Sequence, residues 1–382
     1  MKKNLLFSLI VLASVVSHSQ VIYKKLESLK LDQTREIKIQ LPRGYENNPE
    51  KKYPIFIVLD GDYMFEVVAA NVDYLSYWQD MPDAIVVGVN QVDTRFEDSM
   101  YGQQNSLPID SSASFFEFIG IELVPYIEKT YRTTGFRVLV GHGSTANYIN
   151  YFLLKPLPLF SGYIVSSPEL APNMLDYIPE RFQKLEDKTF YYLANTKKDS
   201  KSVLEMTSAL NQDLVSIDNP NIEYTYKLYE GASHYSLPTR VIPEAIEQFF
   251  KIYQPISKEE YQNVILKLEY SPVTYLQEKY GAINDFYGVE KPVIINDFKA
   301  IAAAIEKNEG FEYYEELSKI ANKYYPDSLL SGYYLGRFYE ETGKAKKAMH
   351  TYQEAFAKEE IAGITKDYIL ELVDAIKDDF GY

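Results

Sequence analysis

The sequence predicts an α/β fold, with a largely parallel sheet covered by helices on both faces, followed by a smaller all-helical domain. Two observations support this prediction. From about residue 35 to 254, short apolar segments alternate with helical patterns, as in sheets whose parallel strands are joined by helices. After Pro255 the strand signals stop, and helical patterns rich in alanine and tyrosine continue to the end. A chain of 382 residues has room for one large domain and a smaller one.

The first 19 residues have the pattern of a secretory signal peptide. Lys2 and Lys3 precede an apolar run over residues 5–16, and Ser17-His18-Ser19 then precedes Gln20. The apolar run is too short to span a bilayer. We therefore expect residues 1–19 to be cleaved and the mature protein to be periplasmic or secreted.

The composition excludes several classes of function. The net charge of −15 disfavours binding to nucleic acid or to an anionic membrane, because no excess of basic residues is available to neutralise phosphates. The chain has no cysteine, which excludes disulfides, thiolate chemistry and lipidation at an N-terminal cysteine. We expect no nucleic-acid partner and no membrane span.

Within the predicted sheet, the strands differ in their hydrophobic patterns. Ile37, Ile39 and Leu41 alternate with polar residues, which is typical of a half-exposed edge strand. Further, mostly more buried strands are predicted over residues 54–59, 84–89, 138–140, 163–165, 190–193 and 222–228. A helix is predicted over 115–131 from its apolar spacing, and another ends near Tyr253, with Pro243 early in it, where a fixed φ is tolerated.

The C-terminal part contains one recognisable repeat. Residues 329–362 match the spacing of a tetratricopeptide unit, whose small residues let two antiparallel helices approach closely; the matching positions are Leu335-Gly336, Tyr339, Gly343, Ala348, Tyr352 and Ala355. Residues 295–328 fit the same frame poorly. We predict a domain over 20–254, a helical linker over 255–294 and a tetratricopeptide-like domain over 295–382. Because a short array needs neighbours for burial, we expect this tail to dock on the preceding domain and to offer a surface to a cell-envelope protein.

Residues 137–147 carry the most informative motif. A buried apolar strand runs into Gly141-His142, where a serine hydrolase of α/β architecture would next place its nucleophile on a sharp turn between strand and helix. That position holds Gly143, and Ser144 follows one place later. The chain therefore has the setting for acyl-transfer chemistry without the hydroxyl that performs it.

A histidine in a suitable place can be found by elimination. Of the four histidines, His18 lies in the leader, His350 in the repeat and His142 at the variable position of the turn. His234 lies in a loop after one strand and before the last helix of the domain, which is where the general base of such an enzyme belongs.

Several further motifs occur in a fixed order along residues 30–254. They are Tyr53-Pro54 with Leu59-Asp60-Gly61-Asp62, Arg95-Phe96-Glu97-Asp98, residues 122–127 with Tyr131-Arg132-Thr133, Ser166-Ser167-Pro168-Glu169-Leu170, and Ser233-His234-Tyr235-Ser236. In this order they resemble the esterase family of α/β hydrolases, the group around esterase D and the siderophore esterases. The resemblance implies an α/β-hydrolase fold for this part of the chain.

The resemblance also implies roles for individual residues. Gly143 falls on the nucleophile and His234 on the base, and Asp199 is the best candidate for the acid, with a solvated loop acid as the alternative. The backbone N–H groups of Ser144 and of Asp62 or Tyr63 would form the oxyanion hole.

The sequence also departs from the family pattern. The acid's turn, residues 195–199, lacks the family's glycine, and Thr145 and Ala146 replace the elbow's usual glycines and should crowd it. Ser166 and Ser167 are expected to serve the sheet edge.

Two functional hypotheses follow. In the first, the protein is a catalytically impaired esterase-family member that binds an acyl or ester ligand, or a protein. In the second, it is an active carboxylic-ester hydrolase that uses Ser144 with His234 and Asp199. Ser144 should begin the helix and offer its N–H rather than its hydroxyl, which favours the first hypothesis. Neither chemistry requires a cofactor or a metal, and we expect none.

Overall fold

The computed structural model describes residues 21–381, so the predicted signal peptide lies outside the described residues. The chain forms two compact units. Of the described residues, the first contains 21–74 together with Asp83–Thr133 and Arg137–Pro243. The second contains Leu75–Pro82, Thr134–Phe136 and residues 244–381.

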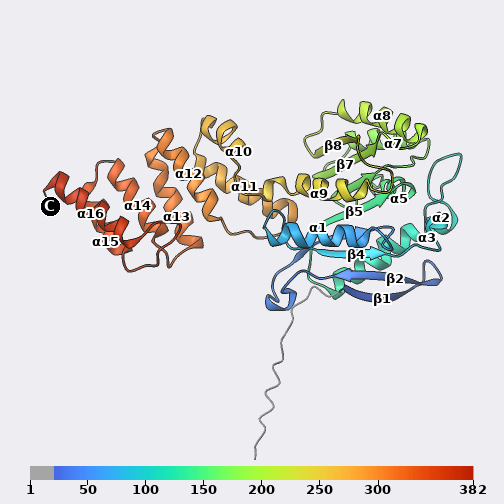
Figure 1. Cartoon of the computed structure of the whole chain (residues 1–382), viewed down its shortest axis with the longest axis horizontal. Coiled ribbons are helices and arrows are strands. Elements are labelled where there is room, and N and C mark those ends of the chain that lie inside the picture. The colour runs from blue at the N-terminus through green and yellow to red at the C-terminus, as the bar shows by residue number, and fades with distance from the viewer. Residues whose placement is uncertain (1–20, 382) are drawn as a thin grey trace, which may run out of the picture. The chain divides into compact units, whose positions relative to one another are not determined.

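An eight-stranded sheet forms the centre of the first unit (Figure 1). Its order is β1-β2-β4-β3-β5-β6-β7-β8, in which β1 and β2 run antiparallel to their neighbours and the others are parallel. The strands are β1 (Val21–Ser28), β2 (Gln33–Gln40), β3 (Tyr53–Val58), β4 (Ile85–Val89), β5 (Thr133–His142), β6 (Gly162–Ser166), β7 (Thr189–Thr196) and β8 (Ile222–Tyr229). The predicted mostly parallel α/β fold is confirmed.

The prediction of an edge strand around Ile37 and Ile39 was wrong. β1 pairs with β2 along its whole length and is the outer strand. Sequence patterns missed β1 because most of its residues are exposed or half-exposed. Within β2, the polar position between the isoleucines is buried too, since Lys38 packs over the ring of Phe65 and forms an ion pair with Glu66.

Helices connect the strands of the sheet, and the predicted helix over 115–131 is divided into α3, a π-helical segment η2 and α4. The helical segments before residue 250 are η1 (Tyr45–Asn47), α1 (Phe65–Tyr77), α2 (Arg95–Asp98), α3 (Asp110–Glu117), η2 (Phe118–Leu123), α4 (Val124–Thr130), α5 (Ser144–Tyr148), α6 (Asn150–Leu153), α7 (Met174–Gln183), α8 (Lys201–Val215) and α9 (Pro238–Phe249).

Alternate residues of the central strands pack on opposite faces of the sheet. Ile57, Val87 and Leu139 belong to one large buried cluster together with residues of α3, α5, α6 and α7. The intervening positions face the other side, where Phe65 of α1 lies against Gly88 of β4. Because both faces are covered, β3 and β4 are buried along their full lengths.

The second unit is helical from residue 244 to 381, apart from isolated bridges. Its elements after α9 are η3 (Lys251–Tyr253), α10 (Lys258–Asn263), η4 (Ile265–Lys267), α11 (Pro272–Tyr287), α12 (Ile295–Lys307), η5 (Phe311–Tyr313), α13 (Tyr314–Tyr324), α14 (Leu329–Glu341), α15 (Ala345–Ala355) and α16 (Lys366–Phe380). Tyr287 is fully buried against Phe136 and Phe250, and its hydroxyl donates to the carbonyl of Phe249.

The residues that suggested a repeat form a close helix pair. A Cβ on Gly336 of α14 would lie 2.0 Å from the ring of Tyr352 in α15, and one on Gly332 would lie 2.3 Å from the Cβ of Ala355. Glycine is therefore what allows α14 and α15 to approach this closely. The assignment of this pair to the tetratricopeptide family stays a prediction.

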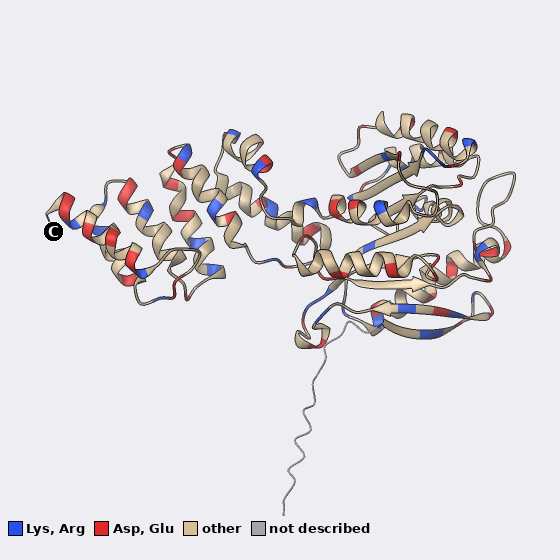
Figure 2. Cartoon of the chain, in the orientation of Figure 1, with Lys and Arg blue, Asp and Glu red and all other residues tan. Residues whose placement is uncertain are grey.

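Basic and acidic residues are interspersed along the helices of both units (Figure 2). Across residues 21–381, no helix is both long and apolar enough to cross a membrane.

Two glycines inside helices of the second unit should respond oppositely to the same substitution. Gly336→Ala should lower the free energy of unfolding by about 1–3 kcal/mol, because the new methyl overlaps the buried ring of Tyr352. Gly281→Ala in α11 should raise it by about 0.5–1 kcal/mol, since its methyl meets no atom within 4 Å and alanine favours the helix. Urea unfolding of the full chain measures both values, and equal effects would contradict this account of Gly336.

Candidate active site

The sharp turn predicted at residue 143 lies between β5 and α5. Gly143 has φ 64° and ψ −120°, a conformation that residues with a side chain rarely adopt. Its N–H donates to the carbonyl of Ser166 in β6, at 3.0 Å, and its own carbonyl accepts from the N–H groups of Asn147 and Glu169. These bonds fix the turn at the carboxyl ends of β5 and β6, where open α/β sheets place their ligands.

The side chain of Thr145 fits in the turn, so the crowding expected at this position does not occur. The backbone is instead crowded at Gly141, where a Cβ would lie 2.6 Å from the carbonyl oxygen of Thr145. The Thr145 hydroxyl accepts from the N–H of His142 at 3.0 Å and donates to Asp60 Oδ2 at 2.7 Å. A threonine therefore stabilises the turn by hydrogen bonding at a place where the resemblance predicted glycine.

A side chain at position 143 would point into a space lined by polar groups. A Cβ built on Gly143 lies 3.3 Å from Arg95 Nη2, 3.8 Å from His234 Nε2 and 4.0 Å from Glu169 Oε1. A serine hydroxyl there would extend from a Cβ that is already close to Nε2 of His234.

His234 and Asp199 are joined by a short hydrogen bond. His234 Nδ1 lies 2.8 Å from Asp199 Oδ1, and the Asp199 side chain is 0% exposed, so it is not a solvated loop acid. In a neutral ring, donation from Nδ1 leaves Nε2 unprotonated, and Nε2 is the atom that lies near Gly143. This is the arrangement of a general base and the acid that orients it.

The second oxygen of the Asp199 carboxylate is also bonded. Oδ2 accepts from the hydroxyl of Ser167 at 2.6 Å and from the N–H of Thr196 at 2.9 Å. Ser167 is fully buried and has φ 47°, an unusual value for a serine. Ser167 was expected only to serve the sheet edge, and its hydroxyl also orients Asp199. The neighbouring Ser166 hydroxyl is buried without a partner among the described residues.

Arg95 is held beside the turn by Asp60. The buried Asp60 carboxylate accepts from Arg95 Nε at 2.7 Å and from Nη2 at 3.2 Å, and Arg95 Nη2 also donates to the carbonyl of His142 at 2.8 Å. Burial acts to lower the pKa of Arg95, but its hydrogen bond and ion pair with Asp60 raise it overall. Arg95 is therefore a fixed positive charge next to Gly143. The motif around Arg95 is recognisable in the sequence, but this placement is not.

The three residues proposed for the oxyanion hole differ in what their N–H groups bind. The Tyr63 N–H donates to the carbonyl of Asp60 at 3.1 Å, so it is already used within the turn after β3. In the described part of the chain, no acceptor is found for the N–H of Asp62 or of Ser144. Asp62 and Ser144 are therefore the pair that could donate to a ligand oxygen.

His142 supports the loop that carries His234. Its Nε2 lies 3.2 Å from the carbonyl of His234, and its Nδ1 lies 3.3 Å from the hydroxyl of Tyr63. Burial, with a smaller contribution from the charge of His234, lowers the pKa of His142 to about 4. The ring is therefore neutral at pH 7, with Nε2–H donating to the loop.

Ser144 is the first residue of α5 and is half-buried. No hydrogen bond of its hydroxyl is found within residues 21–381, either to His234 or to another group. No group of three or more His, Cys, Asp or Glu side chains in that range is placed to hold a metal ion.

Comparisons with known proteins agree with the esterase-like α/β fold. Residues 28–184 match the family model described as Putative esterase. An uncharacterised protein from Capnocytophaga ochracea has a similar structure, with 29% identity and a TM-score of 0.85 over 94% of this chain and 100% of that one. An IroE-like serine hydrolase from Shewanella oneidensis is 24% identical, with a TM-score of 0.59 over 79% of this chain and 98% of that one.

A third structure, the BES protein from Bacillus cereus, is 21% identical, with a TM-score of 0.52 over 65% of this chain and 97% of that one. At these lower identities, the second and third structures support the fold alone. No curated protein matches the chain.

The neutral state of His142 should make the fold sensitive to acid. The pKa is about 4 in the folded protein against 6.5 for an ordinary histidine. As the pH falls from 6.5 to 4, the unfolded chain binds a proton at this histidine and the folded chain does not. The free energy of unfolding therefore falls by up to about 3 kcal/mol, and the loss is complete near pH 4. His142→Gln should shrink the difference in unfolding free energy between pH 7 and pH 4 by that amount. An unchanged difference would show that His142 is not buried and neutral.

Proposed function

We propose that this chain, whose α/β domain belongs to the esterase family of α/β hydrolases, binds the acyl group of ester ligands without forming a covalent acyl-enzyme. The observation that carries the proposal is the geometry at Gly143. A Cβ there would lie 3.8 Å from Nε2 of His234, whose Nδ1 is bonded to Asp199. The position is therefore that of a nucleophile, and glycine supplies none.

The other parts of such a site fit ligand binding. The N–H groups of Asp62 and Ser144 would donate to the carbonyl oxygen of an ester, as oxyanion-hole donors do. Arg95 and His234 would contact the polar atoms next to that carbonyl. These groups would also bind a ground-state ester, so their presence does not require turnover.

Loss of the nucleophile should nearly abolish hydrolysis. Removing the serine of a Ser-His-Asp triad lowers kcat by a factor on the order of 10⁶ in a serine protease. The His234–Asp199 pair cannot replace the covalent step, because the step needs an oxygen bonded to the enzyme. We also propose, from the predicted signal peptide, that the protein binds its ligand outside the cytoplasm.

Wild-type protein should be inert toward covalent ester chemistry. A fluorophosphonate probe should leave it unlabelled, and a short-chain nitrophenyl ester should be turned over no faster than by Ser144→Ala. Gel fluorescence and nitrophenolate absorbance measure the two effects. Labelling of the wild type that disappears in Ser144→Ala would instead establish the alternative, an active hydrolase that uses Ser144.

Restoring serine at position 143 should cost stability. Gly143→Ser places a side chain at φ 64°, at a cost on the order of 1–3 kcal/mol, and its Cβ lies within 3.3 Å of Arg95 Nη2. The melting temperature should therefore fall by several degrees. Ser144→Ala is the matched control, since residue 144 has ordinary helical geometry, and it should change the melting temperature little. A neutral Gly143→Ser would mean that residue 143 is not held in this strained conformation.

A further inference from the structure

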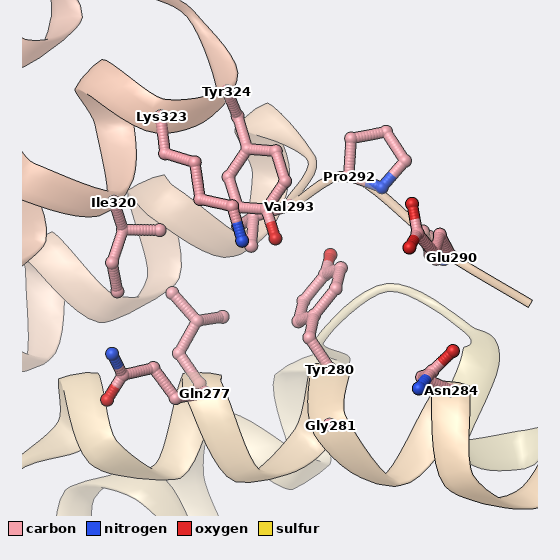
Figure 3. A pocket seen from close by; sticks show the side chains of 12 residues that line it. Gln277, Tyr280, Gly281, Asn284, Glu290, Pro292, Val293, Ile320, Lys323 and Tyr324 are labelled. Carbon is pink, nitrogen blue, oxygen red and sulfur yellow. The ribbon is translucent and has the colours of Figure 1, made fainter.

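The second unit contains a cavity that is separate from the candidate active site. Its volume is about 680 Å³, and it lies between α11, the segment 290–293 and α13. Figure 3 shows the side chains of Lys323 and Tyr324 extending from α13 into the space above α11, with Tyr280 rising from the opposite wall. The ester site proposed above uses no residue of this cavity.

The floor of the cavity is apolar and rigid. Leu276, Val293 and Ile320 are buried, and each contributes to the lining. The Tyr280 hydroxyl donates to the buried Asp297 at 2.8 Å and accepts from the N–H of Ile294 at 3.1 Å, so the ring is held in place from behind. An aliphatic side chain could be buried on this floor without displacing a polar group.

One face of α11 carries a polar stripe along the cavity. Gln277, Gly281 and Asn284 are four and three residues apart, so they lie on the same helix face. No hydrogen bond within residues 21–381 occupies the carboxamide of Gln277 or Asn284. A carboxamide both donates and accepts, as a peptide bond does.

The spacing of these amides suits an extended backbone. Seven helical residues separate Gln277 from Asn284 by about 10 Å along the axis. Three residues of extended chain span about the same length, since each advances by about 3.3 Å. Gly281 lies between the two amides, and a Cβ there would meet no atom within 4 Å. Its missing side chain leaves room for a backbone to pass close to the helix.

Three charged side chains border the cavity. Lys291 donates a hydrogen bond to the carbonyl of Tyr253. Glu290, from the segment after α11, and Lys323, from α13, have neither an ion-pair nor a hydrogen-bond partner in the described residues. Their opposite signs favour a ligand that carries a basic group at one end and an acidic group at the other. The segment 290–293 therefore contributes both an apolar wall and one of these charges.

We propose that this cavity binds an extended peptide segment of a partner protein. One aliphatic side chain enters the apolar floor, the peptide backbone bonds to Gln277 and Asn284, and flanking charged residues pair with Glu290 and Lys323. The proposal is independent of the ester site, since all of these residues belong to the second unit.

The test uses two fluorescein-labelled, capped pentapeptides, Lys-Ala-Leu-Ala-Glu and Glu-Ala-Leu-Ala-Lys, which cover both orientations. Fluorescence polarisation with the full chain should show saturable binding of one of them at concentrations up to about 1 mM. Replacing its leucine by glycine should weaken binding at least tenfold. Failure of both peptides to saturate, or equal binding of the glycine version, would overturn the proposal.

A variant that fills the cavity provides the second arm. Gly281→Leu adds a side chain to the polar stripe and should weaken binding at least tenfold, whereas Ala303→Leu, at an exposed position of α12 outside the lining, should change it less than twofold. Circular dichroism and melting temperature confirm that both variants fold. Equal affinity of the two folded variants would place the peptide elsewhere and contradict the proposal.

Discussion

At the end of β5 the backbone must reverse from strand to helix within one residue, and Gly143 makes that reversal at φ 64°. The geometry of the site depends on this turn. It requires glycine at position 141, where a side chain would overlap the carbonyl of Thr145, and it directs position 143 toward His234. In an active hydrolase the same turn is strained by the nucleophile's side chain, whereas glycine adopts it at little cost. Glycine at this position therefore offers no hydroxyl and leaves the turn unstrained.

The surrounding polar groups remain organised around the position that the hydroxyl would occupy. Asp199 is buried and fully hydrogen-bonded, and it orients His234 through a 2.8 Å contact. Asp60, like Ser167, adopts a positive φ next to the site, and its carboxylate anchors Arg95. Conformations of this kind persist only where neighbouring interactions compensate for their cost. Their presence beside Gly143 supports the binding role that we propose for this site.

The sequence predicted most of the sheet because its central strands are continuous apolar runs that have no other stable placement. β1 could not be predicted in that way, since Lys24 and Lys25 make it look like a polar loop and only pairing with β2 makes it a strand. His234 was located by elimination and by its loop. The contact between Ser167 and Asp199 was not predictable, because it depends on the pairing of β6 with β7 and on a positive φ that no local pattern indicates. The sequence also could not exclude Tyr63 from the oxyanion hole. Its N–H donates to the carbonyl of Asp60, and this bond depends on the conformation of the turn after β3.

The central claim is that residue 143 occupies the place of a nucleophile beside an intact His234–Asp199 pair. Intact-protein mass spectrometry of Gly143→Ser after incubation with a short-chain nitrophenyl ester tests this claim most directly. We predict a mass increase of one acyl group, which peptide analysis maps to residue 143. This increase should be abolished when His234→Gln is added, and it should be absent from the wild type. An acyl group on Ser144 in the wild-type protein would contradict it.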